Sequence, residues 1–158
     1  MAANDGGPPR VEELQTIIDF AIEKEKEAIA FYSDLADKVE VKALAEELRK
    51  LAATEEGHRE RLEKMDVAAV ATSAPREVMD LRIADYVVER KPSPDMSWED
   101  ILNIAMHREL ASINLYTDLE RLVTDPMAKQ LFQNLASDER SHKLFFEKIW
   151  DDEVLKSN

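Results

Sequence analysis

The chain has 158 residues, 34 acidic and 21 basic, which gives a formal net charge of −13. It contains no cysteine, which excludes disulfides, thiolate nucleophiles, iron–sulfur clusters and cysteine-ligated zinc. The acidic balance disfavours binding to duplex nucleic acid, and no apolar run approaches the roughly 20 residues that span a membrane. We therefore expect a cytoplasmic, mainly helical protein with neither nucleic acid nor membrane as a partner.

Proline positions divide the first half of the chain. Residues 1–9 have neither a basic segment nor an apolar one and are expected to form a disordered tail. One helix is predicted from about residue 10 to 37 and a second from about 41 to 65, because no proline interrupts them. The short connection between these two helices predicts an antiparallel hairpin over residues 10–65.

The second half repeats this plan after a long connection. Residues 66–96 are predicted to form a crossover with a short helix over 76–90. A third helix is expected to begin after Ser97, and a fourth after Asp125, with Pro126 at its first position, ending near residue 151. The prediction is a single all-α domain over residues 10–155. It is a four-helix bundle in which hairpins 10–65 and 97–151 are joined by the crossover.

An internal repeat supports this organisation, because shifting the sequence by 84 residues aligns its two halves without a gap. The identical pairs are Glu25/Glu109, Tyr32/Tyr116, Leu35/Leu119, Leu51/Leu135, Ala52/Ala136, Glu55/Glu139 and His58/His142. The chain therefore contains two copies of one helical hairpin.

Each predicted helix has one apolar face, and each of these faces carries a carboxylate near its middle. In the second and fourth helices a histidine follows one turn later. The six polar residues on these faces are Glu25, Glu55, His58, Glu109, Glu139 and His142. Val41 begins the apolar face of the second helix.

Four ionised carboxylates in an apolar interior are unstable without a compensating charge, because desolvation and mutual repulsion both disfavour ionisation. Two divalent cations would balance them. Carboxylate oxygens with imidazole nitrogens suit iron or manganese, and zinc also binds such groups. A single Glu-x-x-His in a charged helix is usually solvated surface, and Glu23 and Glu27 are expected to be exposed. A second copy of the same three residues on an apolar face favours a metal site.

Several neighbouring residues admit two interpretations. Tyr32 and Tyr116 are either ordinary core aromatics or hydrogen-bonding partners of the carboxylates. Asp138 lies four residues before His142 and is a candidate to hold its imidazole, although Thr54 occupies the equivalent place in the first half. The off-face His107 is expected to be exposed. Gly57 marks either close packing or access to the metals.

The segments Glu25…Tyr32, Glu55-Glu56-Gly57-His58, Glu109…Tyr116 and Glu139-Arg140-Ser141-His142 resemble those of the ferritin-like di-iron carboxylate superfamily, and specifically of rubrerythrin-like proteins. The resemblance implies two iron ions, with Glu25 and Glu109 as terminal ligands and Glu55 and Glu139 as bridges. His58 and His142 would each cap one metal. Tyr32 would bond Glu109, and Tyr116 would bond Glu25.

The chain departs from rubrerythrins proper in two places. It has no cysteine to build their small iron domain, and Ser112 stands where they have an additional glutamate. The resemblance implies reduction of hydrogen peroxide or O2 by a homodimer supplied by an external electron donor. One alternative is a ferroxidase that serves iron storage or delivery. The other is a metal-stabilised bundle that acts as an interaction module.

Overall fold

The computed structural model describes residues 8–73 and 81–153, and every regular element among them is helical. The elements are α1 (Pro8–Lys38), α2 (Lys42–Glu63), α3 (Val67–Ser73), the 3-10 helix η2 (Ile83–Tyr86), α4 (Trp98–Leu122) and α5 (Pro126–Glu153). The predicted all-α class is confirmed. The chain divides into two compact units, residues 1–79 and 80–158, which are described separately below.

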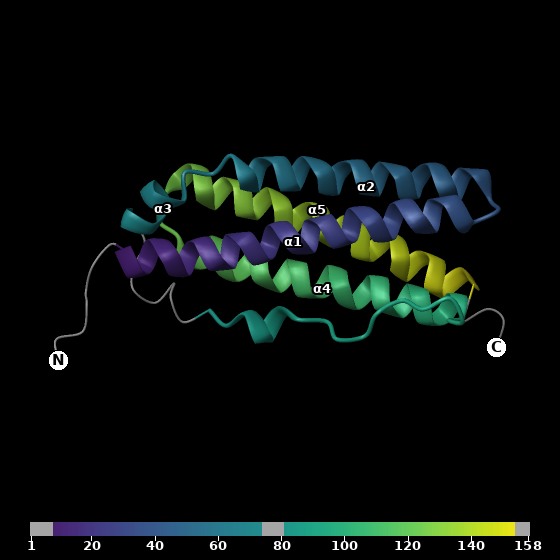
Figure 1. Ribbon diagram of the computed structural model, residues 1–158. Helices are drawn as coiled ribbons and strands as arrows, with labels where there is room; N and C mark the ends of the chain where they lie inside the picture. The colour runs from purple at the N-terminus through teal and green to yellow at the C-terminus, as the bar shows by residue number, and fades with distance from the viewer. Residues whose placement is uncertain (1–7, 74–80, 154–158) are drawn as a thin grey trace. The chain divides into compact units, whose positions relative to one another are not determined.

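The first unit is an antiparallel helical hairpin. Residues 39–41 connect α1 to α2, and the two helices lie side by side along their length (Figure 1). The short helix α3 follows α2 and packs on α1. Its first turn is capped by Asp66, whose Oδ1 accepts a hydrogen bond from the backbone N–H of Ala69 at 3.1 Å.

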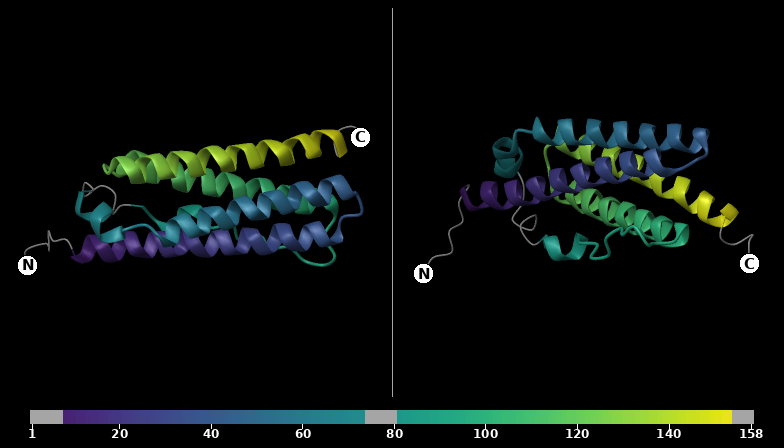
Figure 2. Two further views of the ribbon diagram at one scale, coloured as in Figure 1. Left: turned by 90° about the horizontal axis from the view of Figure 1, so that it is seen from above. Right: turned by 45° about the vertical axis from the view of Figure 1, so that its right-hand side comes forward.

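The second unit has the same plan, with residues 123–125 connecting α4 to α5 (Figure 2). Two side-chain hydrogen bonds hold the segment before α4 against that helix. The hydroxyl of Tyr86 in η2 donates to Asp118 Oδ2 at 2.6 Å, and Arg90 Nη2 donates to Asp100 Oδ1 at 2.7 Å. This segment therefore lies along α4 over most of the helix length.

Both helix starts predicted in the second unit are confirmed by their capping bonds. Ser97 Oγ accepts from the N–H of Asp100 at 3.1 Å, and Asp125 Oδ2 accepts from the N–H of Ala128 at 2.8 Å. At the equivalent start of α2, Val41 makes no such bond with its side chain.

The predicted apolar faces form the cores of the two units. Their fully buried side chains include Leu14, Ile18, Tyr32, Leu48, Leu62, Leu102, Tyr116, Leu119, Phe132, Leu135 and Phe146. Val41 is an exception, because its side chain is 63 % exposed at the end of the hairpin turn. Its assignment to the buried face was wrong, since the face begins one turn further into α2.

The crossover differs from its prediction. The part of the predicted helix 76–90 that the structure describes contains only the single 3-10 turn η2, while α3 forms earlier, over residues that were not assigned to a helix. Residues 1–7 of the predicted tail lie outside the described residues, and Pro8 and Pro9 belong to α1 instead. None of the described helices combines the length and apolar character that crossing a membrane requires.

Candidate metal centre

The first unit brings three predicted ligands together inside its hairpin. Glu25 of α1 and Glu55 and His58 of α2 are buried, with 2 %, 0 % and 0 % of their surfaces exposed. His58 Nδ1 lies 3.6 Å from Glu25 Oε1 and 3.5 Å from Glu55 Oε2. The three side chains offer ligand atoms that lie within 4.8 Å of one another.

The second unit contains the same arrangement. Glu109 of α4 and Glu139 and His142 of α5 are buried, and His142 Nδ1 lies 3.6 Å from Glu109 Oε1 and 3.2 Å from Glu139 Oε1. The ligand atoms of these three residues also lie within 4.8 Å of one another. Each hairpin thus holds one complete triad of two carboxylates and one imidazole.

The sequence explains why each triad meets at one level of its hairpin. Glu25 lies 15 residues before Glu40 in the turn and Glu55 lies 15 residues after it, since 40 − 25 = 55 − 40. The same count relates Glu109 and Glu139 to Thr124. Antiparallel helices therefore carry the two carboxylates to equal distances from the turn. The spacing of three residues puts each histidine beside its glutamate on one helix face.

In the first triad, burial disfavours the charged forms of the ionisable side chains. Burial raises the pKa of Glu25 well above its ordinary value, and the nearby carboxylate of Glu55 raises it further. Burial lowers the pKa of His58, but the two glutamates outweigh this effect and raise the pKa to about 10. A positive charge is therefore strongly favoured beside these carboxylates, and without a metal the imidazolium of His58 supplies it.

The donor atoms also fit a metal ion. Two donors each about 2.1 Å from one ion are about 3.0–3.6 Å apart when the angle between them is about 90–120°. The separations between the histidine nitrogen and the carboxylate oxygens in both triads, 3.2–3.6 Å, fall in this range. Carboxylate oxygens combined with an imidazole nitrogen are a donor set for iron or manganese, with zinc as a further candidate.

The two tyrosines at equivalent places are both buried, each with 1 % of its surface exposed. The ring of Tyr32 meets Phe31 edge-on with centroids 5.4 Å apart, and the ring of Tyr116 stacks on Phe132 at 6.3 Å. Both rings are therefore packed in the core, which fits either interpretation. Their hydrogen bonds to the carboxylates stay a prediction, as does a hydrogen bond from the His142 imidazole to the carboxylate of Asp138, which is half-buried.

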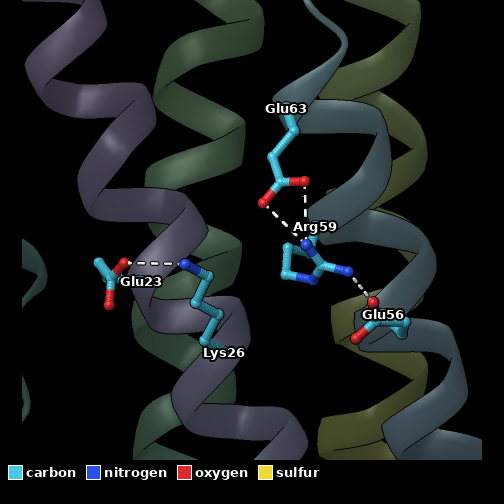
Figure 3. Close-up of polar contacts among 5 residues, drawn as sticks. All are labelled: Glu23, Lys26, Glu56, Arg59 and Glu63. Atoms are coloured by element: carbon cyan, nitrogen blue, oxygen red, sulfur yellow. Dashed lines mark hydrogen bonds and ion pairs between the residues drawn. The ribbon is translucent and has the colours of Figure 1, made fainter.

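Charged side chains on the hairpin surface are paired among themselves. Lys24 pairs with Glu27 at 3.0 Å, and Lys26 pairs with Glu23 at 3.3 Å (Figure 3), so both glutamates lie outside the site as predicted. His107 is also exposed, and its Nδ1 lies 2.8 Å from the backbone oxygen of Asn103.

The sequence analysis missed the ion pairs of Arg59, which directly follows the candidate ligand His58. Its guanidinium binds Glu56 and also binds Glu63 at 2.8 Å, forming a charged network on α2 (Figure 3). In the second unit Lys143 and Glu147 form the equivalent pair. The repeat offset could have identified it, because Arg59 aligns with Lys143 and Glu63 with Glu147.

Gly57 lies between Glu55 and His58, the two candidate ligands of α2. A Cβ atom added there would meet Arg61 Nη2 at 3.7 Å, an ordinary contact with the end of a flexible side chain. Arg61 Nε also donates to the backbone oxygen of Gly57 at 3.3 Å. Close packing within the hairpin therefore does not require the glycine.

The fold and the two triads define an all-helical protein with buried clusters of glutamate and histidine that could hold metal ions. The rubrerythrin family model matches residues 16–150, and the chain belongs to this family. No curated protein matches the chain.

Two solved structures are similar to the chain. One is a hypothetical protein from Pyrococcus furiosus, with 23 % identity, a TM-score of 0.64 and coverage of 87 % of this chain and 88 % of that one. The other, from Thermotoga maritima, is described as a ferritin-like diiron-carboxylate protein. It has 22 % identity and a TM-score of 0.69, and the match covers 89 % of this chain and 95 % of that one. At these identities the likeness shows the ferritin-like fold.

Proposed function

We propose that the two triads together hold two iron ions, and that the protein is an oxidoreductase that reduces hydrogen peroxide or O2. The observation that carries this proposal is the repetition of one buried triad, with the same residues, the same spacing and nearly the same separations, in both hairpins. A surface cluster would not be buried twice at equivalent places.

Charge balance supports two divalent ions. The four glutamates contribute −4 when ionised, and two divalent cations contribute +4, so the filled centre is neutral with both histidines uncharged. Each triad on its own matches one cation in the same way. Desolvation then no longer opposes ionisation of Glu25 and Glu55, because each carboxylate has a cation beside it.

We assign the ligand roles by the family likeness. In that assignment Glu25 and Glu109 would serve as terminal ligands and Glu55 and Glu139 as bridging ligands, and the two histidines would each hold one ion. When bound, ferrous iron supplies the electrons that break the O–O bond of the oxidant. The chain orients the ligands on rigid helices and surrounds them with apolar side chains that exclude water.

Tyr32 and Tyr116 are proposed to hold the glutamates of the opposite hairpin in position through their hydroxyl groups. A separate redox protein is the proposed electron donor, because the chain has no cysteine with which to build an iron–sulfur centre of its own.

The net charge of −13 favours a second candidate function, the oxidation of incoming iron for storage or delivery, because an acidic surface attracts Fe²⁺. The two functions differ in how much iron the protein keeps. A storage protein accumulates ferric iron beyond two ions per chain during repeated additions of Fe²⁺ and O2. An oxidoreductase stays at two and cycles when a reductant is supplied.

The decisive experiment is anaerobic Fe²⁺ titration followed by separate additions of O2 and H2O2, with the oxidation followed optically. We expect two iron ions to bind per chain. The bound Fe²⁺ should be oxidised faster by whichever of O2 and H2O2 is the physiological oxidant than by the other. The Glu55→Ala and Glu139→Ala double variant should lose stoichiometric binding. Two ions still bound by that variant would refute the site.

Glu56→Ala provides the matched control, because Glu56 adjoins Glu55 on α2 but pairs with Arg59 on the surface. It should bind two ions like the unchanged chain. Equal loss of iron in both variants would mean that general charge, rather than the triad, holds the metal.

A further inference from the structure

Two exposed leucines interrupt the polar surface of the second hairpin. Leu110 in α4 is 42 % exposed, and Leu144 in α5 is 59 % exposed. The other large apolar side chains that are exposed in the described part of the chain, Val41, Val87 and Met127, lie at helix ends or outside the long helices. A helix normally turns its apolar residues towards the core, so two outward leucines well inside α4 and α5 are unusual.

The two leucines lie on the same side of the hairpin. Leu110 precedes Thr117 by seven residues, which is two turns of α4, and these two residues therefore share one row. Leu144 follows Arg140 by four residues, about one turn of α5. Arg140 Nη2 donates to Thr117 Oγ1 at 3.2 Å on the surface, so the two rows border each other.

The exposed residues around the two leucines are uncharged or basic. Together they form a surface, called here the leucine face, that consists of His107, Leu110, Asn114, Arg140, Leu144 and Lys148, all of them exposed. On the same side of α5, Glu147 pairs with Lys143, and Asp151 lies beyond Lys148 near the helix end. The leucine face therefore carries two positive charges on a chain whose net charge is −13.

The first hairpin shows that the fold does not impose this composition. By the repeat offset, the equivalent residues are Glu23, Lys26, Ala30, Glu56, Glu60 and Lys64. Three of them are acidic, at the places where the leucine face has histidine, arginine and leucine. Glu23 pairs with Lys26, and Glu56 pairs with Arg59 (Figure 3), as on an ordinary solvated surface. The second hairpin thus has apolar and basic residues at positions that can be fully polar.

The leucine face lies over the second triad. Leu110 directly follows Glu109 in α4, and Leu144 lies two residues after His142 in α5. Glu109 and His142 are themselves buried, with 2 % and 5 % of their surfaces exposed. A molecule that docks on the leucine face is therefore separated from the triad by about the thickness of one helix, roughly 10 Å.

We propose that the leucine face docks the electron donor, and that this donor is a small protein whose apolar contact patch is surrounded by carboxylates. The proposal rests on the proposed oxidoreductase function, because only that function consumes electrons repeatedly. Two partly exposed leucines make a small apolar centre, and small interfaces are typical of redox proteins that meet briefly. The basic residues attract an acidic partner that the acidic remainder of the chain repels, so they set where it docks.

The electron count defines what the donor does. Reduction of one molecule of H2O2 to two of water, or of O2 to one of H2O2, consumes two protons and two electrons, which two ferrous ions supply on becoming ferric. A one-electron donor must therefore dock and leave twice in each turnover. A small contact with a charged rim allows fast association and fast release.

Binding of oxidised plant-type ferredoxin, an acidic one-electron protein, tests the surface without any electron transfer. Isothermal titration calorimetry with the full chain should show binding at low ionic strength that weakens as salt is added. Lys148→Glu should weaken this binding by about tenfold, because it reverses a charge that faces the partner. Lys64→Glu is the matched control, since it makes the same charge change at the equivalent position of the first hairpin, and it should leave binding unchanged.

A paired substitution tests the leucines separately from the charges. Leu110→Lys combined with Leu144→Glu gives the second hairpin the residues that the first has at these positions, and it leaves the net charge unchanged. Ferredoxin binding should weaken by about tenfold through loss of the apolar contact. Because both side chains are exposed, circular dichroism should show the same helix content, and the variant should still bind two iron ions.

Stopped-flow reduction of the iron-loaded, oxidised chain separates docking from the reaction. Reduced ferredoxin should act about tenfold more slowly on Lys148→Glu and on the paired leucine variant than on Lys64→Glu. Reduced methyl viologen, a small one-electron donor that needs no docking surface, should reduce all of them at the same rate. Iron that methyl viologen cannot reduce, or a chain that binds no iron, would contradict the proposed function, and the donor's role would fall with it.

Other outcomes would overturn the docking proposal alone. These are an iron-loaded chain that methyl viologen reduces but ferredoxin does not bind, and equal weakening by Lys64→Glu and Lys148→Glu. Self-association of the chain that the paired leucine variant abolishes would also overturn it, because a second copy would then cover the leucine face.

Discussion

Replacement of Glu55 by glutamine separates the contribution of the ligand to metal binding from its contribution to the fold. Glutamine keeps the shape of the side chain and removes one charge from a fully buried position. In the metal-free protein Glu25 remains 3.6 Å from His58 Nδ1 and continues to act as its counter-charge. Ordinarily, removing one partner of a buried pair destabilises a fold by about 3–5 kcal/mol, because a charge is left uncompensated.

In the metal-free Glu55→Gln variant the loss of folding stability should be much smaller. Glu25 and Glu55 offer oxygens within 4.8 Å of each other, where two full charges repel by about 3.5 kcal/mol or more at an effective dielectric constant near 20. Removing this repulsion offsets much of the lost attraction to His58. We expect the free energy of unfolding of the metal-free variant to stay within about 1 kcal/mol of the unchanged chain.

The metal-loaded protein should behave differently. At a free metal concentration 100 times the dissociation constant, each ion stabilises the native state by about 2.7 kcal/mol. For a chain of this size that corresponds to a rise of roughly 5–10 °C in Tm. Loss of a carboxylate ligand should remove most of this rise.

Differential scanning calorimetry of both proteins, with chelator and with anaerobic Fe²⁺, measures these quantities, and Glu56→Gln is the control. Two results would refute the reasoning. One is a metal-free variant destabilised by several kcal/mol, and the other is an unchanged rise in Tm with iron. A chain whose Tm does not respond to iron or chelator would mean that metal does not stabilise the fold, which would also contradict the metal-stabilised interaction module.

Three further substitutions have expected effects on stability that chemical denaturation can measure. Val41→Asp should stabilise the protein by about 1 kcal/mol, because it gives α2 the capping carboxylate that Asp125 gives α5, and an unchanged midpoint would contradict this. Gly57→Ala should also stabilise by about 1 kcal/mol, since the added methyl group meets nothing closer than 3.7 Å within its hairpin, and a loss of stability would show that the space is needed. Tyr86→Phe should cost about 1.5–3 kcal/mol through the lost hydrogen bond to the Asp118 carboxylate, and a neutral result would mean that packing alone holds the segment on α4.

The hairpins could be predicted because local and long-range signals agree there. Ser97, Asp125 and Pro126 mark helix starts by their own hydrogen bonding and fixed backbone, and the structure confirms all three. The apolar faces followed from spacing alone, because a helix must bury one side. The internal repeat then shows the same apolar and polar positions a second time, in the other hairpin.

The crossover could not be predicted in the same way. Its apolar residues suggested a helix over 76–90, but the described part is an irregular segment with one 3-10 turn, η2, which packs against α4. Contacts such as that of Tyr86 with Asp118 decide this conformation, and they join residues 32 positions apart. Helix α3 did have a local signal in Asp66, which caps it three residues before Ala69.

The burial and clustering of the six candidate ligands could be predicted because carboxylates on apolar faces are rare and these occur in register. The sequence analysis missed the charged network around Arg59, because a charged side chain one residue after a candidate ligand resembles ordinary helix surface, and only the alignment of Arg59 with Lys143 in the repeat points to it. The separations of 3.2–3.6 Å within each triad also required the structure, since they depend on how closely the helices of each hairpin pack.

All six candidate ligands lie more than one turn inside their helices, so fraying of the helix ends does not reach them. A bound ion would therefore be released only when a whole hairpin opens, an event far rarer than the loosening of a loop. Exchange of the metal with the surroundings should then be slow even if its equilibrium affinity is modest, and the amide protons beside the ligands should be among the last to exchange with deuterium.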